Sequence, residues 1–245
     1  MKRLLAFVYG LTAYAVSFGT TLYAVGFIGN ILVPKTMDSA PHTHWTQALL
    51  ANVLLIGVFA LQHSVMARPA FKKVWTRIVP EPVERSTYVL ASSLALILLF
   101  WLWQPMGGVV WNVQDTNGRT LLYILYALGW LTVFGSTYAI NHWDLFGLRQ
   151  VYCYLRGESY QTISFASPGP YRYVRHPIYL GWLLTFWVTP TMTIAHLVFA
   201  VATTLYILIA IRFEERDLID YFGDTYRQYR KRVAMIIPFP GKTLR

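Results

Sequence analysis

The most constraining feature of this sequence is a run of 35 residues, Pro177 to Ile211, that contains no aspartate, glutamate, lysine or arginine. As a single α-helix this run would be roughly 52 Å long, whereas the hydrocarbon core of a bilayer is about 30 Å thick. The segment "VTPTMT" in its middle contains Pro190, which lacks the backbone donor that a continuous helix uses. The run therefore predicts a helical hairpin with its turn near Pro190.

The distribution of basic residues supports the hairpin. The chain has 21 lysines and arginines. If the N-terminus is cytoplasmic and the hairpin is real, all of them except Lys35 and Arg119 lie on the cytoplasmic side. A single crossing would move the basic C-terminal segment to the far side, against the positive-inside tendency of membrane proteins. The sequence therefore predicts that both termini are cytoplasmic.

Composition places the whole chain in a membrane. Hydrophobic residues make up 56% and charged residues 13% of the 245 residues, against about 25% charged residues in a soluble domain. Four further uncharged stretches approach or exceed the length needed to cross a bilayer. The first is too long for a signal peptide, so we expect it to be retained. The predicted fold is an all-α, polytopic transmembrane helical bundle with four long spans plus the C-terminal hairpin, the spans being about 4–33, 46–66, 87–105 and 120–140.

Several functional classes are disfavoured. The net charge of +10 comes from residues at the ends of apolar runs, a topology pattern rather than a nucleic-acid groove. Cys153 has no second cysteine to pair with, so no internal disulfide or cysteine metal cluster is expected. His42 and His44 lack enough neighbouring ligands for a metal site. Because no Gly-rich phosphate or dinucleotide motif occurs, any cofactor is expected to bind between the membrane helices and their cytoplasmic ends.

The segment "SPGPYRYVRHPIYLGW" is the first candidate for chemistry. Its Pro-Gly-Pro predicts a rigid turn, and Pro177 suits the first turn of a helix while disfavouring helical geometry at His176. Gly181 allows close approach of a backbone or a ligand. The alternative is an aromatic and basic anchor at the membrane edge.

Glu214 and Glu215 follow the hairpin and are the second candidate. Adjacent helical residues point about 100° apart, so the two carboxylates do not face one ligand together. One is expected to accept hydrogen bonds from a ligand, and the other to pair with Arg172 or Arg175. The alternative is a solvated helix end with i,i+4 ion pairs, which we favour for the acidic residues after it and for the arginines from position 227 onward.

Two histidine clusters complete the set. His142 and Asp144 lie in "INHWDLFGLRQVY", and a histidine beside a carboxylate suits proton abstraction. His63 lies at the end of the second predicted span, where polar side chains usually face a bundle interior. The alternatives are headgroup contacts for the first cluster and a helix–helix hydrogen bond for His63. His196, inside the hairpin, is expected to bond to a neighbouring helix.

The motifs "RHPIYLGW", "EERDL" and "FGDTYRQYRKRVAMIIPF", with the hairpin between them, resemble the C-terminal half of isoprenylcysteine carboxyl methyltransferase-like membrane proteins. In that family the Arg-His-Pro turn and the Glu-Glu pair enclose S-adenosylmethionine. "FALQHSVMARPAFK", "PEPVERSTYVL" and "INHWDLFGLRQ" are similar to the methanethiol S-methyltransferases, a branch related to the NnrU family. This second resemblance implies that S-adenosylmethionine and methanethiol give dimethyl sulfide and S-adenosyl-L-homocysteine.

The resemblance also implies roles for individual residues. A thiolate is the competent nucleophile, so His142 oriented by Asp144, or His63, is expected to take up the thiol proton. The aromatic faces of Trp143 or Tyr179 are expected to hold the sulfonium. The cofactor-binding residues would be Tyr171, Tyr173, Arg175, His176, Pro177, Tyr179, Gly181, Trp182, Glu214 and Glu215. The catalytic, substrate-side residues would be His63, Asn141, His142, Asp144 and Arg149.

The resemblance predicts one integral membrane methyltransferase domain over 1–245. Its parts would be a four-span substrate-side bundle, 1–140, and a cofactor-binding part, 141–245, with the hairpin 177–211 and a cytoplasmic C-terminal helix. The expected partners are a small thiol and the lipid bilayer, with no nucleic acid, no metal and no obligate protein partner. The expected location is a bacterial inner membrane, with the cofactor site facing the cytoplasm.

Three alternatives remain open at this point. The first is methylation of a lipid-linked or isoprenylcysteine substrate, which the upstream motifs disfavour. The second is an integral membrane reductase that uses a reduced nicotinamide cofactor. The third is a non-enzymatic NnrU-like membrane protein.

Overall fold

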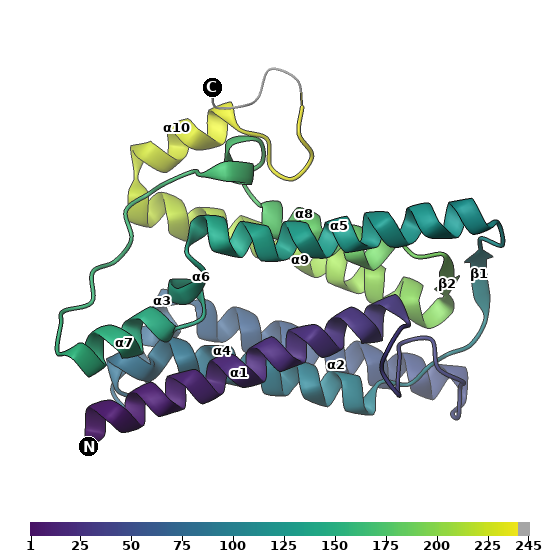
Figure 1. The fold of residues 1–245 in the computed structure, drawn as a ribbon, viewed down its shortest axis with the longest axis horizontal. Helices are drawn as coiled ribbons and strands as arrows, with labels where there is room; N and C mark the ends of the chain where they lie inside the picture. The colour runs from purple at the N-terminus through teal and green to yellow at the C-terminus, as the bar shows by residue number, and fades with distance from the viewer. Residues whose placement is uncertain (240–245) are drawn as a thin grey trace. The chain divides into compact units, whose positions relative to one another are not determined.

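The long apolar stretches form helices, because a helix satisfies its own backbone hydrogen bonds within a bilayer. The structure is a computed structural model that describes residues 1–239; residues 240–245, the end of the predicted cytoplasmic tail, lie outside the described part. The elements, shown in Figure 1, are α1 (Lys2–Gly29), α2 (Trp45–Ala67), α3 (Pro69–Trp75), α4 (Glu81–Leu102), β1 (Val109–Asn112), α5 (Thr116–Ile140), α6 (His142–Leu145), α7 (Leu148–Arg156), η1 (Gly169–Arg172), α8 (Pro177–Trp187), β2 (Thr191–Thr193), α9 (Ile194–Phe222) and α10 (Asp224–Arg232).

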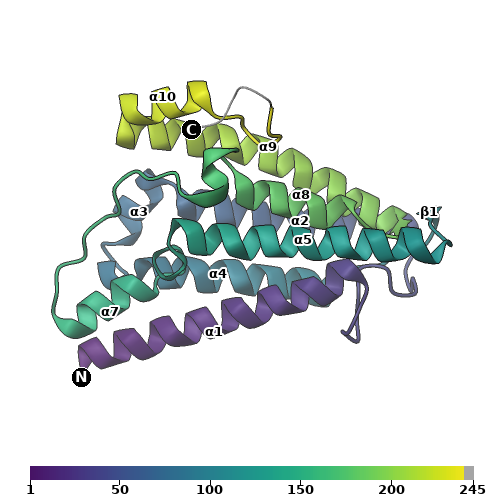
Figure 2. The same ribbon diagram turned by 45° about the horizontal axis from the view of Figure 1, so that its top comes forward.

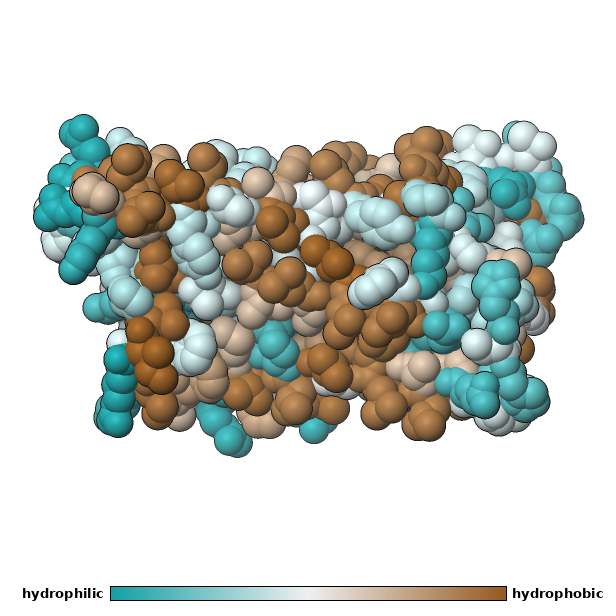
Figure 3. All heavy atoms as spheres, turned by 90° about the horizontal axis from the view of Figure 1, so that it is seen from below, coloured by the Kyte–Doolittle hydropathy of each residue, from teal (hydrophilic) through white to brown (hydrophobic). Residues whose placement is uncertain are grey.

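Within residues 1–239, five helices are long and apolar enough to cross a membrane: α1, α2, α4, α5 and α9. Figure 3 shows many hydrophobic side chains exposed on the face in view. Exposed leucines such as Leu50, Leu61 and Leu131 suit lipid contact. The prediction of an all-α, multi-pass membrane protein is confirmed.

The four predicted spans are helical, with shifted ends. The first ends at Gly29 rather than at residue 33, because Asn30 adopts the left-handed conformation (φ 57°) and donates its N–H to the Gly26 carbonyl. The third begins at Glu81, six residues earlier than predicted. Its first turn contains a proline and two acidic residues, Glu81 and Glu84, which favour a helix start.

The predicted hairpin is confirmed, but its two helices are unequal. The connection between α8 and α9 covers residues 188–193 and contains Pro190. His196, near the start of α9, donates Nε2–H to the Phe186 carbonyl of α8 (3.0 Å), as expected for a histidine that bonds to a neighbouring helix. Helix α8 has only 11 residues, about 16 Å at 1.5 Å per residue. The extended residues after it lengthen this arm of the hairpin.

Two short strands were not predicted. β1 and β2 pair antiparallel, with Val109 opposite Thr193 and Asn112 opposite Thr191. The Val113 N–H also donates to the Pro190 carbonyl (2.9 Å). These bonds satisfy backbone groups of the hairpin turn that neither helix reaches. The sequence did not predict these strands because three or four residues are too few to show the alternation of apolar and polar side chains that marks a strand.

Contacts divide the chain into two compact units, residues 1–107 with 141–162 and residues 108–140 with 163–245. In the first unit, α4 packs against α1 and α2, and α7 packs against α1. In the second unit, α8 lies beside both α5 and α9, as Figures 1 and 2 agree. The predicted functional division at 140/141 stays a prediction.

The closest packing in the second unit is a glycine contact between α5 and α8. A Cβ added to Gly181 would lie 2.7 Å from Val133 Cγ2 and 2.8 Å from the Gly129 carbonyl oxygen. A Cβ added to Gly129 would lie 2.9 Å from Thr185 Cγ2. Two facing glycines therefore let the helix backbones meet, as small residues do in membrane helix pairs. This contact fixes α8, whose first turn carries candidate site residues.

Candidate active site

The predicted site residues form two groups, one in each compact unit, and each group is described by itself. The group in the second unit consists of the turn that precedes α8 and the glutamate pair in α9. The group in the first unit consists of the segment 141–149 and His63.

Backbone pairing holds the turn before α8 in place. The Arg175 N–H donates to the Ala234 carbonyl (2.8 Å), and the His176 N–H donates to the Met235 carbonyl (3.1 Å). His176 has φ −125° and ψ 62°, and α8 begins at Pro177. The non-helical geometry predicted for the residue before proline is therefore confirmed.

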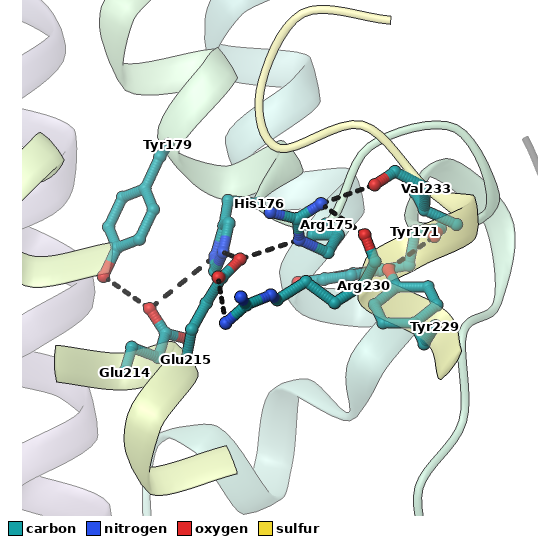
Figure 4. A network of polar contacts seen from close by, with 9 residues as sticks. All are labelled: Tyr171, Arg175, His176, Tyr179, Glu214, Glu215, Tyr229, Arg230 and Val233. Carbon is teal, nitrogen blue, oxygen red and sulfur yellow. Dashed lines mark hydrogen bonds and ion pairs between the residues drawn. The ribbon is translucent and has the colours of Figure 1, made fainter. Parts of the chain in front are cut away.

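Glu215 is the centre of a buried ionic network (Figure 4). Its Oε1 accepts a hydrogen bond from Arg175 Nε at 2.7 Å and lies 3.2 Å from His176 Nε2. Its Oε2 lies 3.7 Å from a guanidinium nitrogen of Arg230. The side chains of Arg175 and Glu215 are each 10% exposed, so the pair is largely removed from solvent. The hairpin thus brings His176 and the glutamates together, as predicted, and Glu215 pairs with Arg175.

Glu214 is in a different environment from its neighbour. Its side chain is 42% exposed, and its Oε2 accepts a hydrogen bond from the Tyr179 hydroxyl at 2.9 Å. The same oxygen lies 3.7 Å from His176 Nδ1. Among residues 1–239, the structure gives Glu214 no lysine or arginine partner. Glu214 is therefore the carboxylate with remaining capacity for a ligand.

Other predicted cofactor residues have mixed surroundings. Tyr171 is buried, and its carbonyl accepts the Tyr229 hydroxyl at 2.6 Å; burial and the nearby Glu214 carboxylate raise the pKa of Tyr171. Trp182 packs on Trp130 of α5, with ring centroids 5.0 Å apart. Tyr173 is exposed. The structure thus gathers one set of predicted residues around Glu215, namely Arg175, His176, Tyr179 and Glu214, and the Gly181 and Trp182 positions face α5.

Sequence reasoning missed the contribution of α10 and the segment after it. Arg230, which had been assigned to a solvated helix end, lies beside Glu215. Arg175 also donates to the Arg230 and Val233 carbonyls. Tyr226 and Tyr229 form a buried cluster with Val233. The aromatic spacing in "TYRQYRKRV" was the available signal, because it places both tyrosines on one helix face.

In the first unit, Asn141 shapes the segment that contains His142. It has φ 116° and ψ 84°, a conformation that non-glycine residues rarely adopt. Its side-chain oxygen accepts the Asp144 N–H at 3.2 Å, which caps the short helix α6. This conformation aims His142 into the protein interior, where it is 3% exposed.

His142 and Asp144 have partners that the sequence did not indicate. The His142 Nε2 lies 2.9 Å from the Tyr14 hydroxyl of α1. Burial lowers the pKa of His142. Asp144 Oδ1 accepts a hydrogen bond from Tyr160 at 2.9 Å and forms an ion pair with Arg149 at 3.2 Å. Burial and the bond to Asp144 raise the pKa of Tyr160 to about 12. The predicted orientation of His142 by Asp144 stays a prediction.

His63 is also held by polar contacts. Its Nε2 lies 2.8 Å from the Tyr88 hydroxyl and its Nδ1 lies 3.1 Å from Ser92 Oγ, both on α4. Tyr88 belongs to a hydrophobic cluster against which Phe146 packs, and the Phe146 ring lies 4.7 Å from that of His142. The first unit therefore links its two candidate histidines through aromatic side chains.

The half-exposed Glu214 carboxylate complements a positively charged ligand. Tyr179 adds an aromatic ring beside this carboxylate. Glu215 holds Arg175 and His176, whereas Glu214 contacts Tyr179 and is half-exposed.

Comparisons with known proteins show which family the chain belongs to. Residues 119–225 match the phospholipid methyltransferase family, a range that contains every candidate site residue except His63. Curated proteins named methanethiol S-methyltransferase are 54% identical in Crocosphaera subtropica, over 99% of this chain and 95% of that protein, and 52% identical in Mycobacterium tuberculosis, over 99% of both. Methanethiol S-methyltransferase 1 of Bradyrhizobium diazoefficiens is 51% identical, over 97% of this chain and 83% of that protein. No solved structure matches the chain. At such identity over nearly the full length, the chain belongs to the methanethiol S-methyltransferase family of membrane methyltransferases.

Proposed function

We propose that this protein transfers a methyl group from S-adenosylmethionine to methanethiol, which gives dimethyl sulfide and S-adenosyl-L-homocysteine. The observation that carries the proposal is the near-full-length identity to proteins named for this reaction. The division between a buried Glu215 and a half-exposed Glu214 beside His176 supports a donor site in the second unit.

In the proposed reaction, the donor supplies a methyl carbon that is activated by its sulfonium. Glu214 and Tyr179 bind the donor, and the other predicted residues of this site, Tyr171, Tyr173, Arg175, His176, Pro177, Gly181, Trp182 and Glu215, form or support its walls. A neutral imidazole accepts the thiol proton. The lowered pKa of His142 keeps its imidazole unprotonated near pH 7. An unprotonated imidazole can accept the thiol proton, so we propose His142 as the base.

The remaining substrate-side residues have supporting roles in this proposal. Asn141 sets the backbone of His142. Arg149 pairs with Asp144 and so balances the charge of this carboxylate in the segment that carries the base. His63 extends the polar surface of the first unit beside Tyr88. The protein is proposed to lie in a bacterial inner membrane, with the site on the cytoplasmic side.

The match to phospholipid methyltransferases gives a second candidate, with a lipid as the methyl acceptor. One assay separates the two. Purified protein in detergent is incubated with S-adenosylmethionine labelled in its methyl group, together with either methanethiol or phospholipid. We expect labelled dimethyl sulfide in the headspace and no labelled lipid. Labelled lipid without dimethyl sulfide would replace the proposed substrate, and the absence of both products would contradict methyl transfer to either acceptor.

A further inference from the structure

Tyr14 contacts the candidate base from a helix that is far away in sequence. It lies 128 residues before His142 in the chain, yet its hydroxyl is 2.9 Å from His142 Nε2. The two rings meet edge to face, with centroids 5.6 Å apart and an interplanar angle of 85°. We propose that Tyr14 is a positioning residue, whose hydroxyl oxygen accepts the Nε2–H of His142 and so fixes the orientation and tautomer of the base. This inference rests on the proposed function.

The surroundings of His142 explain why we expect the Tyr14 hydroxyl to have a large effect on the orientation of the imidazole. The imidazole is enclosed by aromatic rings, with Trp143 at 5.3 Å and Phe146 at 4.7 Å between centroids. Tyr14 itself also packs on Trp143 (5.8 Å) and on Phe146 (5.8 Å). Ring faces restrict the imidazole in space but do not decide which nitrogen carries the proton. The direction of the hydrogen bond between Tyr14 and Nε2 does: a hydroxyl that accepts requires the proton on Nε2.

The charged residues near His142 have partners of their own, and the Tyr14 hydroxyl contacts His142 as a neutral group. Asp144, two residues along, is paired with Arg149 and accepts the Tyr160 hydroxyl. Arg85 of α4 donates Nε–H to the Leu145 carbonyl (2.8 Å). Tyr14 on α1 therefore adds a polar group to the base without adding a charge, so that the imidazole stays neutral before the reaction.

The hydrogen bond has a defined consequence for proton transfer. In the neutral base, Nε2–H donates to Tyr14, and the imidazole takes up the proton of the thiol. The S–H bond breaks, its electron pair stays on sulfur, and the imidazole becomes a cation. A cationic imidazole donates from both nitrogens, and hydrogen bonds to charged groups are stronger than neutral ones. Tyr14 therefore stabilises the protonated product of this step more than its neutral precursor.

The test is Tyr14→Phe, with Tyr9→Phe as its matched control. Tyr9 is also on α1, and its hydroxyl donates to Thr87 Oγ1 at 3.0 Å, away from His142. Both variants remove one hydroxyl from one helix. We expect Tyr14→Phe to lower kcat about 10- to 100-fold, in line with the loss of a group that orients a functional imidazole, with the Kd for S-adenosylmethionine unchanged. Tyr9→Phe should keep wild-type kcat.

The pH profile of kcat gives a result that a purely structural role would not. Without the acceptor, the protonated imidazole is less stable, so the acid limb in Tyr14→Phe should move to lower pH. An unmoved limb with wild-type kcat would overturn the proposal. A limb that moves to higher pH would overturn it too, because the hydroxyl would then be a donor to Nε2.

A second measurement does not depend on activity. The tautomer of His142 is read by NMR of protein labelled with ¹⁵N-histidine in detergent, and the signal is assigned by its loss in His142→Gln. We expect Nε2–H in the wild type and a changed tautomer population in Tyr14→Phe. Absence of dimethyl sulfide would defeat the proposed function, whereas an unchanged tautomer would defeat this inference.

Discussion

Two adjacent glutamates in α9 have contrasting surroundings. Glu215 is buried against Arg175 and His176, while Glu214 is half-exposed beside Tyr179. Breaking a buried ion pair leaves an uncompensated charge, whereas a half-exposed carboxylate can be neutralised at little cost to folding. We therefore expect Glu215 to matter for stability and Glu214 for the proposed ligand binding.

Glu215→Gln should destabilise the protein by about 3–5 kcal/mol, because it leaves Arg175 without its carboxylate. Glu214→Gln should keep the free energy of unfolding within about 0.5 kcal/mol of wild type. It should weaken S-adenosylmethionine binding roughly 10-fold or more, the loss expected for a hydrogen bond to a charged group. Denaturant unfolding and calorimetric titration of both variants check this. Equal effects of the two changes on stability would contradict the contrast.

The lowered pKa of His142 predicts a pH dependence of stability. The unfolded chain protonates this histidine near pH 6.5, and burial makes the folded protein protonate it at lower pH. The stabilisation is therefore complete above about pH 6.5 and is lost as the pH falls below it. Unfolding free energies measured between pH 7.5 and 5 should fall less steeply in His142→Gln than in the wild type. Equal slopes would contradict burial of a neutral imidazole.

For individual residues, the sequence predicted local backbone geometry and candidate site residues better than it predicted which side chains contact one another. Proline after His176 fixed its backbone, and the offset between adjacent helical residues predicted that only one glutamate would pair with an arginine. Tyr14 and Tyr160 were not predicted, because their contacts to His142 and Asp144 depend on tertiary packing across 128 and 16 residues. Arg230 was misassigned because a basic helix end looks alike in solvent and beside a buried carboxylate.

Among the elements, α8 depends on its glycine contact with α5. A methyl group added at Gly181 would meet a Val133 methyl group and two backbone atoms, the Gly129 carbonyl oxygen and the Val133 nitrogen, and the backbone atoms cannot move aside as a flexible side chain can. The helices must separate to accommodate it. Since α8 begins directly after His176 and carries Tyr179, the displacement should reach the proposed donor site.

Gly181→Ala should cost about 1–3 kcal/mol through overpacking and should also weaken S-adenosylmethionine binding. The control is Gly135→Ala on α5, where an added Cβ meets nothing within 4 Å; its stability should stay within about 1 kcal/mol of wild type. Thermal unfolding in detergent and donor titration compare the two variants. If Gly181→Ala were as stable as Gly135→Ala, the close helix contact would be wrong.

The helical hairpin was predictable because the thickness of a bilayer limits the length of a single membrane-spanning helix. An uncharged run longer than a bilayer had to fold back, and the structure confirms that it does so around Pro190. The pairing of β1 with β2 and of Val174 with Ala234 was not predictable. Those contacts join segments of a few residues that are far apart in sequence, and nothing local in them marks a partner.

The whole molecule is a multi-pass membrane protein whose predicted orientation can be tested by cysteine labelling. Replacing Cys153 by serine leaves a background without cysteine. Single cysteines are then placed at the exposed positions His42, Glu158 and Asp224. With a membrane-impermeant maleimide, we expect His42→Cys to be labelled in intact cells, and Glu158→Cys and Asp224→Cys only after permeabilisation. Labelling of Asp224→Cys in intact cells would contradict the cytoplasmic C-terminus.

The path of the chain between the two units has a consequence for biogenesis. The first unit includes residues 141–162, so α1 meets its partner α7 only after α5, a helix of the second unit, has left the ribosome. Domains usually fold one after another as they are synthesised, but here neither unit is complete before the other has begun. α1 and α4 therefore gain the α7 part of their packing only after α5 has been made, and the turn before α8 gains its partners Ala234 and Met235 last.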